Sequence, residues 1–550
     1  MKKTTLAAGV FILVIAAFVS LQNSTYSPRR NTSILKESID GAIEYMKKIR
    51  ANQITGKVDL MDVENARNQM EAMATARSQS GINLSWEEMG PDDVGGRTRT
   101  FLIDKDTNTV FYAGGVAGGL WKSWNGGANW RVLFDQSEIN TVSCIAQATN
   151  GDLYVGTGEG HYLGIGTGSA GMIGSGIYKS TNRGASWTRL SSTIPSVLNS
   201  WNETFTFVNE VATSPLNPQR VYACTFHGLR VSDNGGATWY NPIHTADSSV
   251  ASGDVKVASD GTVLVSLDGL AYLSPNGNDN TFVNVSTGSG SGKLPNSGVS
   301  RIEFAFAPSN PNYVYACLAS NGGDLYGLYK STNKGTTWVN IASAFADPLG
   351  GQGSYDNCIV VHPTNKDRFF VGGTTLYSCN SVSSPALWTR ISIQYPGTQD
   401  LYRYVHPDMH VLMCDPLSPQ TLYITCDGGI FKTSNLNTSA SGGPSFSNLN
   451  NGYNVTQFYA IAPTANGGVV GGTQDNGSKY INPSGGTGLH STVIGGGDGG
   501  YTEASFIIPS VFFTTVYFGA LARTFNAGGF GSSFYSDRIE NMTGIYQGGF

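Results

Sequence analysis

The chain has 550 residues, of which 13% are charged and 11% aromatic, and it contains 70 glycines. This composition is typical of many short strands joined by tight turns, and it argues against a helical or disordered protein. The net charge of −5 provides no basic field for phosphate backbones, so the sequence also argues against nucleic acid as a partner.

The first 83 residues differ in character from the rest. Lys2 and Lys3 precede an apolar run over 6–21, which predicts a signal peptide at 1–22, with an uncleaved membrane anchor as the alternative. Strong helix formers over 23–83 predict a helical lead-in segment. We therefore expect an exported protein, extracellular or at the cell surface, with the periplasm as the alternative.

One eight-residue pattern, Ser-x-Asn-x-Gly-x-x-Trp, occurs four times with the same internal spacing. Such repetition indicates a repeat architecture. The copies are Ser123, Asn125, Gly127 and Trp130; Ser180, Asn182, Gly184 and Trp187; Ser232, Asn234, Gly236 and Trp239; and Ser331, Asn333, Gly335 and Trp338. In such a turn the Ser and Asn side chains bond nearby backbone groups, Gly takes a positive φ, and Trp packs against the sheet. These are structural repeat turns and indicate nothing about chemistry.

The pattern belongs to a unit of four short strands in a meander, which is one blade of a propeller. From residue 84 onward about nine units are visible, one of them with a degraded turn ending in Phe282. The predicted fold is therefore all-β: a large β-propeller over 84–550, as one ring of roughly ten blades or as two propellers. No closing strand is evident near Phe550, so we expect a chain that is incomplete at its C-terminus.

The seven cysteines do not suggest a disulfide framework. Cys224 and Cys317 occupy matching strands of two units, and simple hairpin pairing would not place Cys414 opposite Cys426. We expect free thiols buried in strands.

The repeated turn resembles the Asp-box (BNR) repeat, with Asn in the usual Asp position. That repeat occurs in sialidases, sortilin-type propellers and two-propeller xyloglucan-degrading glycoside hydrolases. The later stretches "HPDMHVLMCDP", "LYITCDGGIFKTSN", "GGTQDNG" and "GGGDGG" are similar to exported, glycosyl-hydrolase-like or sortilin-like propellers of the type IX secretion pathway. The resemblance covers roughly residues 84–530 and implies export, with the secretion machinery as a partner.

The resemblance does not imply a catalytic set. Sialidases need an arginine triad that begins in an Arg-Ile-Pro context, which is missing here, and Arg97 and Arg99 stand in "GGRTRT". The xyloglucanase type needs two Asp residues as acid and base. Its N-terminal Asp context matches "YAGGVAGGLW", where Val116 takes the position of the Asp.

The segment "HPDMH" places His406, Asp408 and His410 at period-two spacing, which predicts that all three face one side of a strand. Same-side neighbours on a strand are about 6.6 Å apart, so the two His would be about 13 Å apart. A hydrogen-bonded structural cluster is therefore favoured over a metal site, and whether a metal binds is left unknown.

Three acidic residues beside glycine follow within about 90 residues: Asp427, Asp475 and Asp498. One interpretation is that they only form tight turns. The other is that they converge, with Gln474, His406, Asp408 and His410, on one ligand site suited to a divalent cation or a hydroxyl-rich glycan. We expect no organic cofactor, and a non-catalytic binding, adhesion or scaffold module for a glycan or protein partner. The alternative is a polysaccharide hydrolase.

Overall fold

A computed structural model describes residues 87–133, 141–161, 172–195, 203–244, 252–288, 292–342, 346–383, 385–395, 400–437, 443–482, 489–516, 520–527 and 535–536, with eight isolated positions between 52 and 73. The predicted signal peptide lies outside these residues, as does nearly all of the lead-in segment. Among the residues in these ranges, no helix is long and apolar enough to cross a membrane.

The described chain folds into nine antiparallel sheets, eight with four strands and one with three. The first five sheets are formed by β1 (Thr98–Ile103), β2 (Phe111–Gly115), β3 (Gly119–Ser123) and β4 (Arg131–Val132); β5 (Val142–Gln147), β6 (Leu153–Thr157), β7 (Ile177–Ser180) and β8 (Thr188–Arg189); β9 (Val208–Thr213), β10 (Val221–Thr225) and β11 (Gly228–Ser232); β12 (Ser252–Val257), β13 (Val263–Leu267), β14 (Leu270–Ser274) and β15 (Val283–Asn284); and β16 (Val299–Phe306), β17 (Val314–Ser320), β18 (Leu325–Ser331) and β19 (Val339–Asn340).

The other four sheets are formed by β20 (Cys358–Val361), β21 (Arg368–Gly372), β22 (Tyr377–Asn380) and β23 (Leu387–Arg390); β24 (Met409–Cys414), β25 (Leu422–Cys426), β26 (Gly429–Thr433) and β27 (Ser447–Asn448); β28 (Phe458–Pro463), β29 (Val469–Thr473), β30 (Gly477–Ile481) and β31 (Ser491–Gly495); and β32 (Thr502–Ala504), β33 (Phe512–Val516), β34 (Ala520–Thr524) and β35 (Tyr535–Ser536). Two short 3-10 helices, Ser191–Thr193 and Leu401–Arg403, lie in connections.

Seven of the nine sheets close into a ring. The first strand of each sheet is innermost, because β1, β5, β9, β12, β16, β20 and β24 contact one another in that order and β24 contacts β1 again. At the closure Tyr423 packs on Phe101 and Phe111, with both ring-centroid separations at 5.1 Å. The prediction of a multi-blade propeller is confirmed, and the ring of this chain has seven blades. In the third blade the fourth strand is reduced to a single bridge between Val231 and Tyr240.

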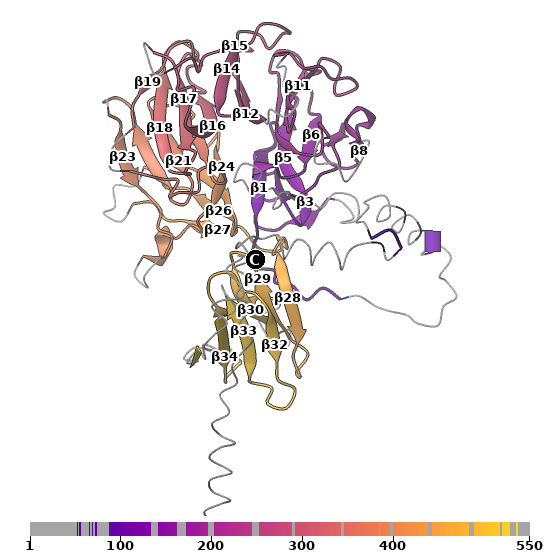
Figure 1. Cartoon of the computed structure of the whole chain (residues 1–550). Helices are drawn as coiled ribbons and strands as arrows, with labels where there is room; N and C mark the ends of the chain where they lie inside the picture. Colours follow the sequence, from indigo (N-terminus) through magenta and orange to yellow (C-terminus); the bar gives the residue numbers. More distant parts are fainter. Residues whose placement is uncertain are drawn as a thin grey trace, which may run out of the picture.

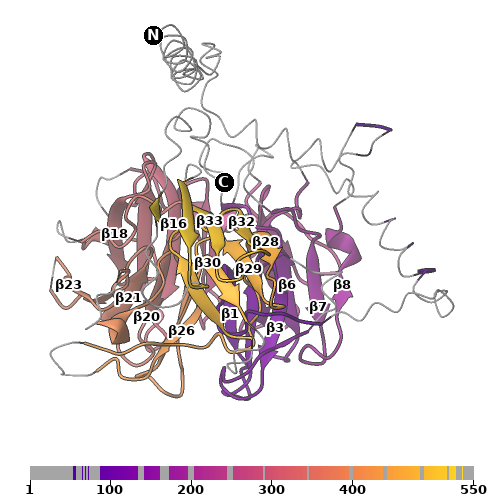
Figure 2. The same cartoon turned by 90° about the horizontal axis from the view of Figure 1, so that it is seen from below.

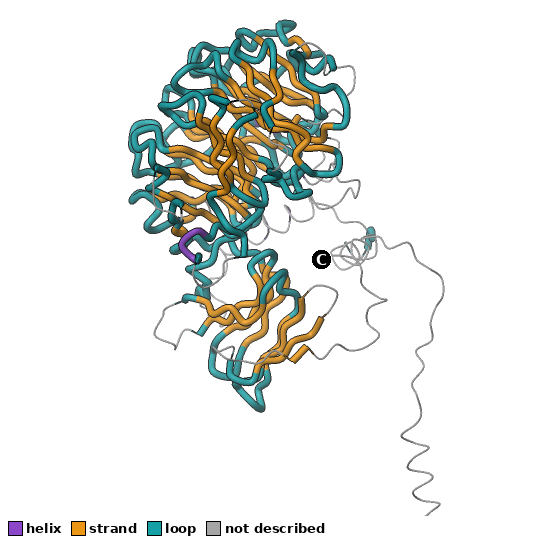
Figure 3. The backbone as a smooth tube through the Cα atoms, turned by 90° about the vertical axis from the view of Figure 1, so that its left-hand side faces the viewer, coloured by secondary structure: helices purple, strands orange, loops and turns teal. Residues whose placement is uncertain are grey.

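The last two sheets form a separate body beside the ring, seen below it in Figure 1 and in front of it in Figure 2. We call β28–β35 the two-sheet unit. Its own apolar core includes Val470, Tyr480 and Phe512. Figure 3 shows the strands of the ring and of this unit as two groups joined by loops. The joining segment 449–457 packs against the first blade, where the Trp130 indole N–H donates to the Leu449 carbonyl at 2.7 Å.

All four complete repeat turns have the same internal bonds. In each, the Ser hydroxyl accepts from the Gly N–H at 2.8–2.9 Å, the hydroxyls being those of Ser123, Ser180, Ser232 and Ser331. The Asn carbonyl oxygen accepts from a backbone N–H four residues on at 2.8–3.0 Å, at Asn125, Asn182, Asn234 and Asn333. The glycine φ values are 83–91°, at Gly127, Gly184, Gly236 and Gly335. The bonds and the positive φ expected from the spacing are therefore present in every copy.

The tryptophans of these turns are less uniform than the rest of the pattern. Trp130 and Trp338 are buried, whereas Trp187 and Trp239 are only half-buried. The expectation that each Trp packs against the sheet is therefore met to different degrees.

The cysteines are as expected. All seven are buried free thiols. In the hairpin of β24 and β25, Cys414 pairs with Leu422 and Cys426 pairs with Met409, so the two sulfurs are not opposite each other.

Candidate functional site

Charged and polar side chains gather where the ring meets the two-sheet unit. We call Arg97, Arg99, Glu159, Tyr355, Asp408, His410, Asp427 and Asp475 the central cluster. They come from the residues before and at the start of β1, the loop after β6, the segment before β20, the residues before and at the start of β24, and the turns after β25 and β29. Residues far apart in the sequence therefore meet because the ring closes and the two-sheet unit docks on it.

The two arginines are held by a buried carboxylate. Glu159 is completely buried and accepts from Arg97 Nη1 at 3.1 Å and from Arg99 Nε at 2.5 Å. Both guanidinium groups also lie over the Tyr355 ring, at 5.2 and 4.3 Å from its centroid. The Glu159 carboxylate and the face of the Tyr355 ring therefore offset the cost of removing the two guanidinium groups from water.

His410 connects the arginines to Asp427. Its Nδ1 lies 2.8 Å from Arg99 Nη1, which can only donate, and its Nε2 lies 2.6 Å from Asp427 Oδ1. The neighbours thus favour a neutral imidazole with its proton on Nε2. Burial and the charge of Arg99 lower the pKa of His410 to about 4.

Asp427 is the ionised member of the three cluster aspartates. Burial alone would raise its pKa, but Arg97 and the hydrogen bond from His410 outweigh burial and hold the pKa well below its ordinary range. The Tyr355 hydroxyl donates to its second oxygen at 2.7 Å. Gly428 permits close packing on this turn, since a Cβ there would lie 2.4 Å from the His406 ring.

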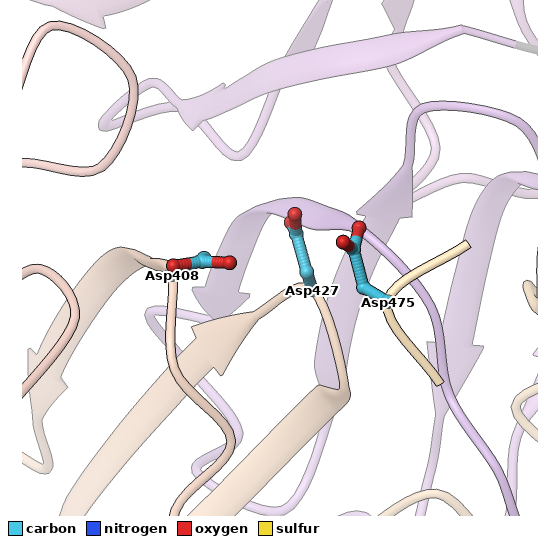
Figure 4. Close-up of side chains that lie close together, drawn as sticks. All are labelled: Asp408, Asp427 and Asp475. Atoms are coloured by element: carbon cyan, nitrogen blue, oxygen red, sulfur yellow. The ribbon is translucent and has the colours of Figure 1, made fainter. Parts of the chain in front are cut away.

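Asp408 and Asp475 lie on either side of Asp427 (Figure 4). One carboxyl oxygen from each of the three residues lies within 4.8 Å of the other two. Asp408 and Asp475 both adopt left-handed backbone, with φ of 61° and 59°. Burial and then the charge of Asp427 raise the pKa of Asp408 to about 6 and that of Asp475 to about 9.

The prediction that His406, Asp408 and His410 face one side of a strand is wrong. β24 begins at Met409, and the left-handed φ of Asp408 breaks the two-residue alternation just after Pro407. Asp408 and His410 still reach the cluster, but His406 instead places its Nε2 3.0 Å from the backbone carbonyl of Asp475.

The other predicted site residues lie on the two-sheet unit at the edge of the cluster. Asp498 accepts from the backbone N–H of Asp475 at 2.7 Å and so supports that turn. Gln474 precedes Asp475, and its backbone N–H donates to the Gln457 carbonyl at 2.9 Å. Asp427, Asp475 and Asp498 therefore converge on one place, and whether that place binds a ligand stays a prediction.

Sequence reasoning missed Glu159, Tyr355 and Asp356, and it considered Arg97 and Arg99 only as candidates for a sialidase triad. A usable signal was present. The innermost strands carry charged residues two positions apart, Arg97/Arg99, Asp254/Lys256 and Arg301/Glu303, and the period of two directs each pair to one side of its strand. Glu159 and Tyr355 stand in irregular segments, where no period marks them.

Comparison with known proteins identifies the fold class. No protein-family model and no curated protein sequence matches the chain. The GH74 xyloglucanase of Xanthomonas campestris has 15% sequence identity and a TM-score of 0.60, and covers 81% of this chain and 68% of its own length. An ancestral GH74 enzyme has 17% identity and a TM-score of 0.58, covering 82% of this chain and 63% of its own length.

A looser match is PorZ, a surface component of the type-IX secretion system of Porphyromonas gingivalis, with 14% identity, a TM-score of 0.47, and coverage of 82% of this chain and 53% of PorZ. At these identities the two GH74 matches show a β-propeller fold and nothing finer. The chain spans about two thirds of the length of the two GH74 structures.

Proposed function

We propose that this chain is an exported, non-catalytic binding module, and that its glycan or protein partner meets the central cluster where the ring and the two-sheet unit join. The observation that carries the proposal is Val116. It is completely buried just after β2, and its N–H donates to the Arg97 carbonyl at 3.2 Å. The sequence resemblance matches it to the N-terminal Asp of the xyloglucanase type. A valine side chain can neither donate nor accept a proton.

The spacing of the remaining acids supports the same proposal. Inverting glycosidases hold their two carboxyl groups roughly 6.5–9.5 Å apart, which leaves room for the attacking water. In the central cluster the oxygens of Asp408, Asp427 and Asp475 lie within 4.8 Å of one another. Asp427 is further occupied by His410 and Tyr355, so it is poorly placed to exchange protons with a substrate.

A hydrolase of the two-propeller xyloglucanase type is the second candidate. It is favoured by Asp475, whose raised pKa of about 9 keeps it protonated at neutral pH, as a general acid requires. Its side chain is 24% exposed, so a substrate could reach it.

The two candidates are separated by an activity and binding test on the full chain. We expect no release of reducing sugar from xyloglucan and no cleavage of a sialoside. In a glycan panel we expect binding that is lost in a His406→Ala/Asp408→Ala double variant and retained in Asp268→Asn, an exposed acid on a distant blade. Xyloglucan turnover that disappears in Asp475→Asn, with the circular dichroism spectrum unchanged, would replace this proposal with the hydrolase.

A further inference from the structure

The three carboxyl groups of Asp408, Asp427 and Asp475 form a geometry that the binding role does not explain. Three acids brought within 4.8 Å repel one another, and such an arrangement is retained only when something offsets the repulsion. Figure 4 shows their side chains next to one another with Asp427 in the middle.

A fourth acid stands beside them. Asp356, just before β20, is completely buried, and neither of its carboxyl oxygens has a hydrogen-bond partner within the described part of the chain. Its electrostatic neighbours are Asp408, Asp427 and Arg301, and the Asp408 carboxyl group is close enough to share a proton with it, so its oxygens face the acid group. Buried polar groups are normally satisfied, and an orphaned pair of oxygens at this position indicates a missing partner.

Acidic groups outnumber basic groups around this point. Only the two arginines supply positive charge in the central cluster, and His410 is held neutral by its neighbours. They face five carboxyl groups, those of Glu159, Asp356, Asp408, Asp427 and Asp475. Both arginines are already engaged by Glu159, and Arg97 is 3.5 Å from Asp427 and 3.9 Å from Asp475, which is too far for short hydrogen bonds.

We propose that Asp408, Asp427 and Asp475 bind a calcium ion, with Asp356 supporting the site from its buried side. Calcium takes oxygen ligands at about 2.3–2.6 Å, so two ligands of one ion can be up to about 5 Å apart, which accommodates oxygens within 4.8 Å of one another. Magnesium, at about 2.0–2.1 Å, accepts ligand oxygens no more than about 4 Å apart, so calcium tolerates the wider range of separations.

The hydrogen bonds already present leave room for the ion. Each oxygen of Asp427 accepts one bond, from His410 and from Tyr355, and a carboxylate has about four lone-pair sites. Asp408 uses one oxygen to accept a long bond of 3.3 Å from Gln352. These bonds fix the orientation of the carboxylates and leave lone pairs on their oxygens available to the ion, as outer-shell partners do at metal sites.

The ion joins the two parts of the molecule. Asp408 and Asp427 belong to the seventh blade of the ring, whereas Asp475 is in the turn between β29 and β30 of the two-sheet unit. Calcium therefore holds the two parts together at this junction. It adds to direct hydrogen bonds such as the one that the Asn476 side chain donates to the Asp427 backbone carbonyl at 2.9 Å. The inference goes beyond the proposed binding role, because it concerns the ion alone and holds whether or not a glycan or protein partner exists.

The test is calcium titration of the full chain after treatment with a chelator. We expect saturable heat of binding in calorimetry with a Kd on the order of 10⁻⁴–10⁻³ M, the range of extracellular calcium modules, and a higher melting temperature in calcium than in an equal concentration of magnesium. Asp408→Asn should weaken calcium binding at least about tenfold and remove the melting shift, because it deletes one ligand charge.

Asp268→Asn is the matched control. Asp268 also has a left-handed φ, 48°, which Asn tolerates, and it is exposed on another blade, so calcium binding should be unchanged. If Asp408→Asn lowers stability on its own, Asp475→Asn provides the second measurement and should show the same loss. Wild-type protein that gives no calcium heat, an equal response to magnesium, or undiminished binding in both variants would overturn the calcium site.

Discussion

The outer repeat turns and the central cluster are built by opposite rules. In each Ser-x-Asn-x-Gly-x-x-Trp turn the Ser and Asn side chains find their partners within a few residues, and the same bonds recur in four blades. In the central cluster most partners are distant in the sequence, with 62 residues between Arg97 and Glu159 and 311 between Arg99 and His410, and the cluster occurs once among the described residues. The repeated turn stabilises a blade, whereas the central cluster gathers buried charged groups at one place.

The comparison teaches that repeated and unique features serve different purposes in this fold. A motif that recurs in several blades cannot define one ligand position, whereas the central cluster, which combines residues of the innermost strands with residues from loops, is unique among the described residues. The following predictions test this division, beginning with the largest expected effect.

The largest effect should come from the tryptophans of the repeat turns. Trp338 is 3% exposed and packs near Phe304, with ring centroids 6.4 Å apart. Trp338→Ala should lower the free energy of unfolding by about 3–5 kcal/mol, measured by urea denaturation. The half-buried Trp239 serves as the comparison, and Trp239→Ala should cost clearly less. Equal losses at the two positions would show that burial does not set the contribution of this residue.

Breaking the central cluster should come next. Asp427→Asn keeps the shape of the side chain but removes the charge that Arg97 and His410 contact. Removing one partner of a buried ion pair leaves the other uncompensated, so we expect a loss of about 3 kcal/mol in the free energy of unfolding. The exposed Asp268→Asn should change it by less than about 0.5 kcal/mol. A melting temperature unaffected by Asp427→Asn would mean that the cluster does not contribute to folding.

A second group of charged residues, on the innermost strands β12 and β16, should make the free energy of unfolding depend on pH. Burial and then the charge of Asp254 raise the pKa of Glu303 to about 7, although Arg301 and Lys256 oppose the shift, and Glu210 adds to it. The folded-state pKa is above the unfolded value of about 4.3, so the stabilisation is complete below pH of about 4 and is lost as pH rises through about 7.

Glu303→Gln isolates this contribution, because Gln is neutral at every pH and retains an oxygen that can accept from Arg301. The melting temperature of the variant relative to wild type should rise between pH values of about 4.5 and about 8. The exposed Glu503→Gln is the control and should show a flat difference across the same range. If the difference for Glu303→Gln is flat as well, Glu303 does not make the stability depend on pH.

The smallest effect should be at a single turn hydroxyl. Ser331 accepts from Gly335 N–H at 2.8 Å and donates to the Asn333 side chain at 2.9 Å. Ser331→Ala should cost about 1 kcal/mol, as one net hydrogen bond does, and should leave calcium and glycan binding unchanged. Altered binding in a folded Ser331→Ala protein would show that the outer turns and the central cluster are coupled.

The sequence by itself determined whatever depends on neighbours along the chain. The Ser-x-Asn-x-Gly-x-x-Trp spacing predicted each turn because its hydrogen bonds close within eight residues. Even the degraded unit retains part of the pattern, since Ser274 accepts from Gly277 N–H at 2.8 Å. The same local reasoning predicted antiparallel strands and buried free cysteines, because strand pairing in a meander involves consecutive segments.

Only the tertiary structure decided the number of blades in the ring and the composition of the central cluster. Ring closure depends on packing between β1 and β24, which no local pattern encodes, and the sequence left one ring or two open. The same closure brings Arg97 to Asp427, and docking of the two-sheet unit brings Asp475 to both. The backbone bend at Asp408 overrode the strand period for the same physical reason. Long-range electrostatics and packing, not propensity, fix the conformation wherever distant segments meet.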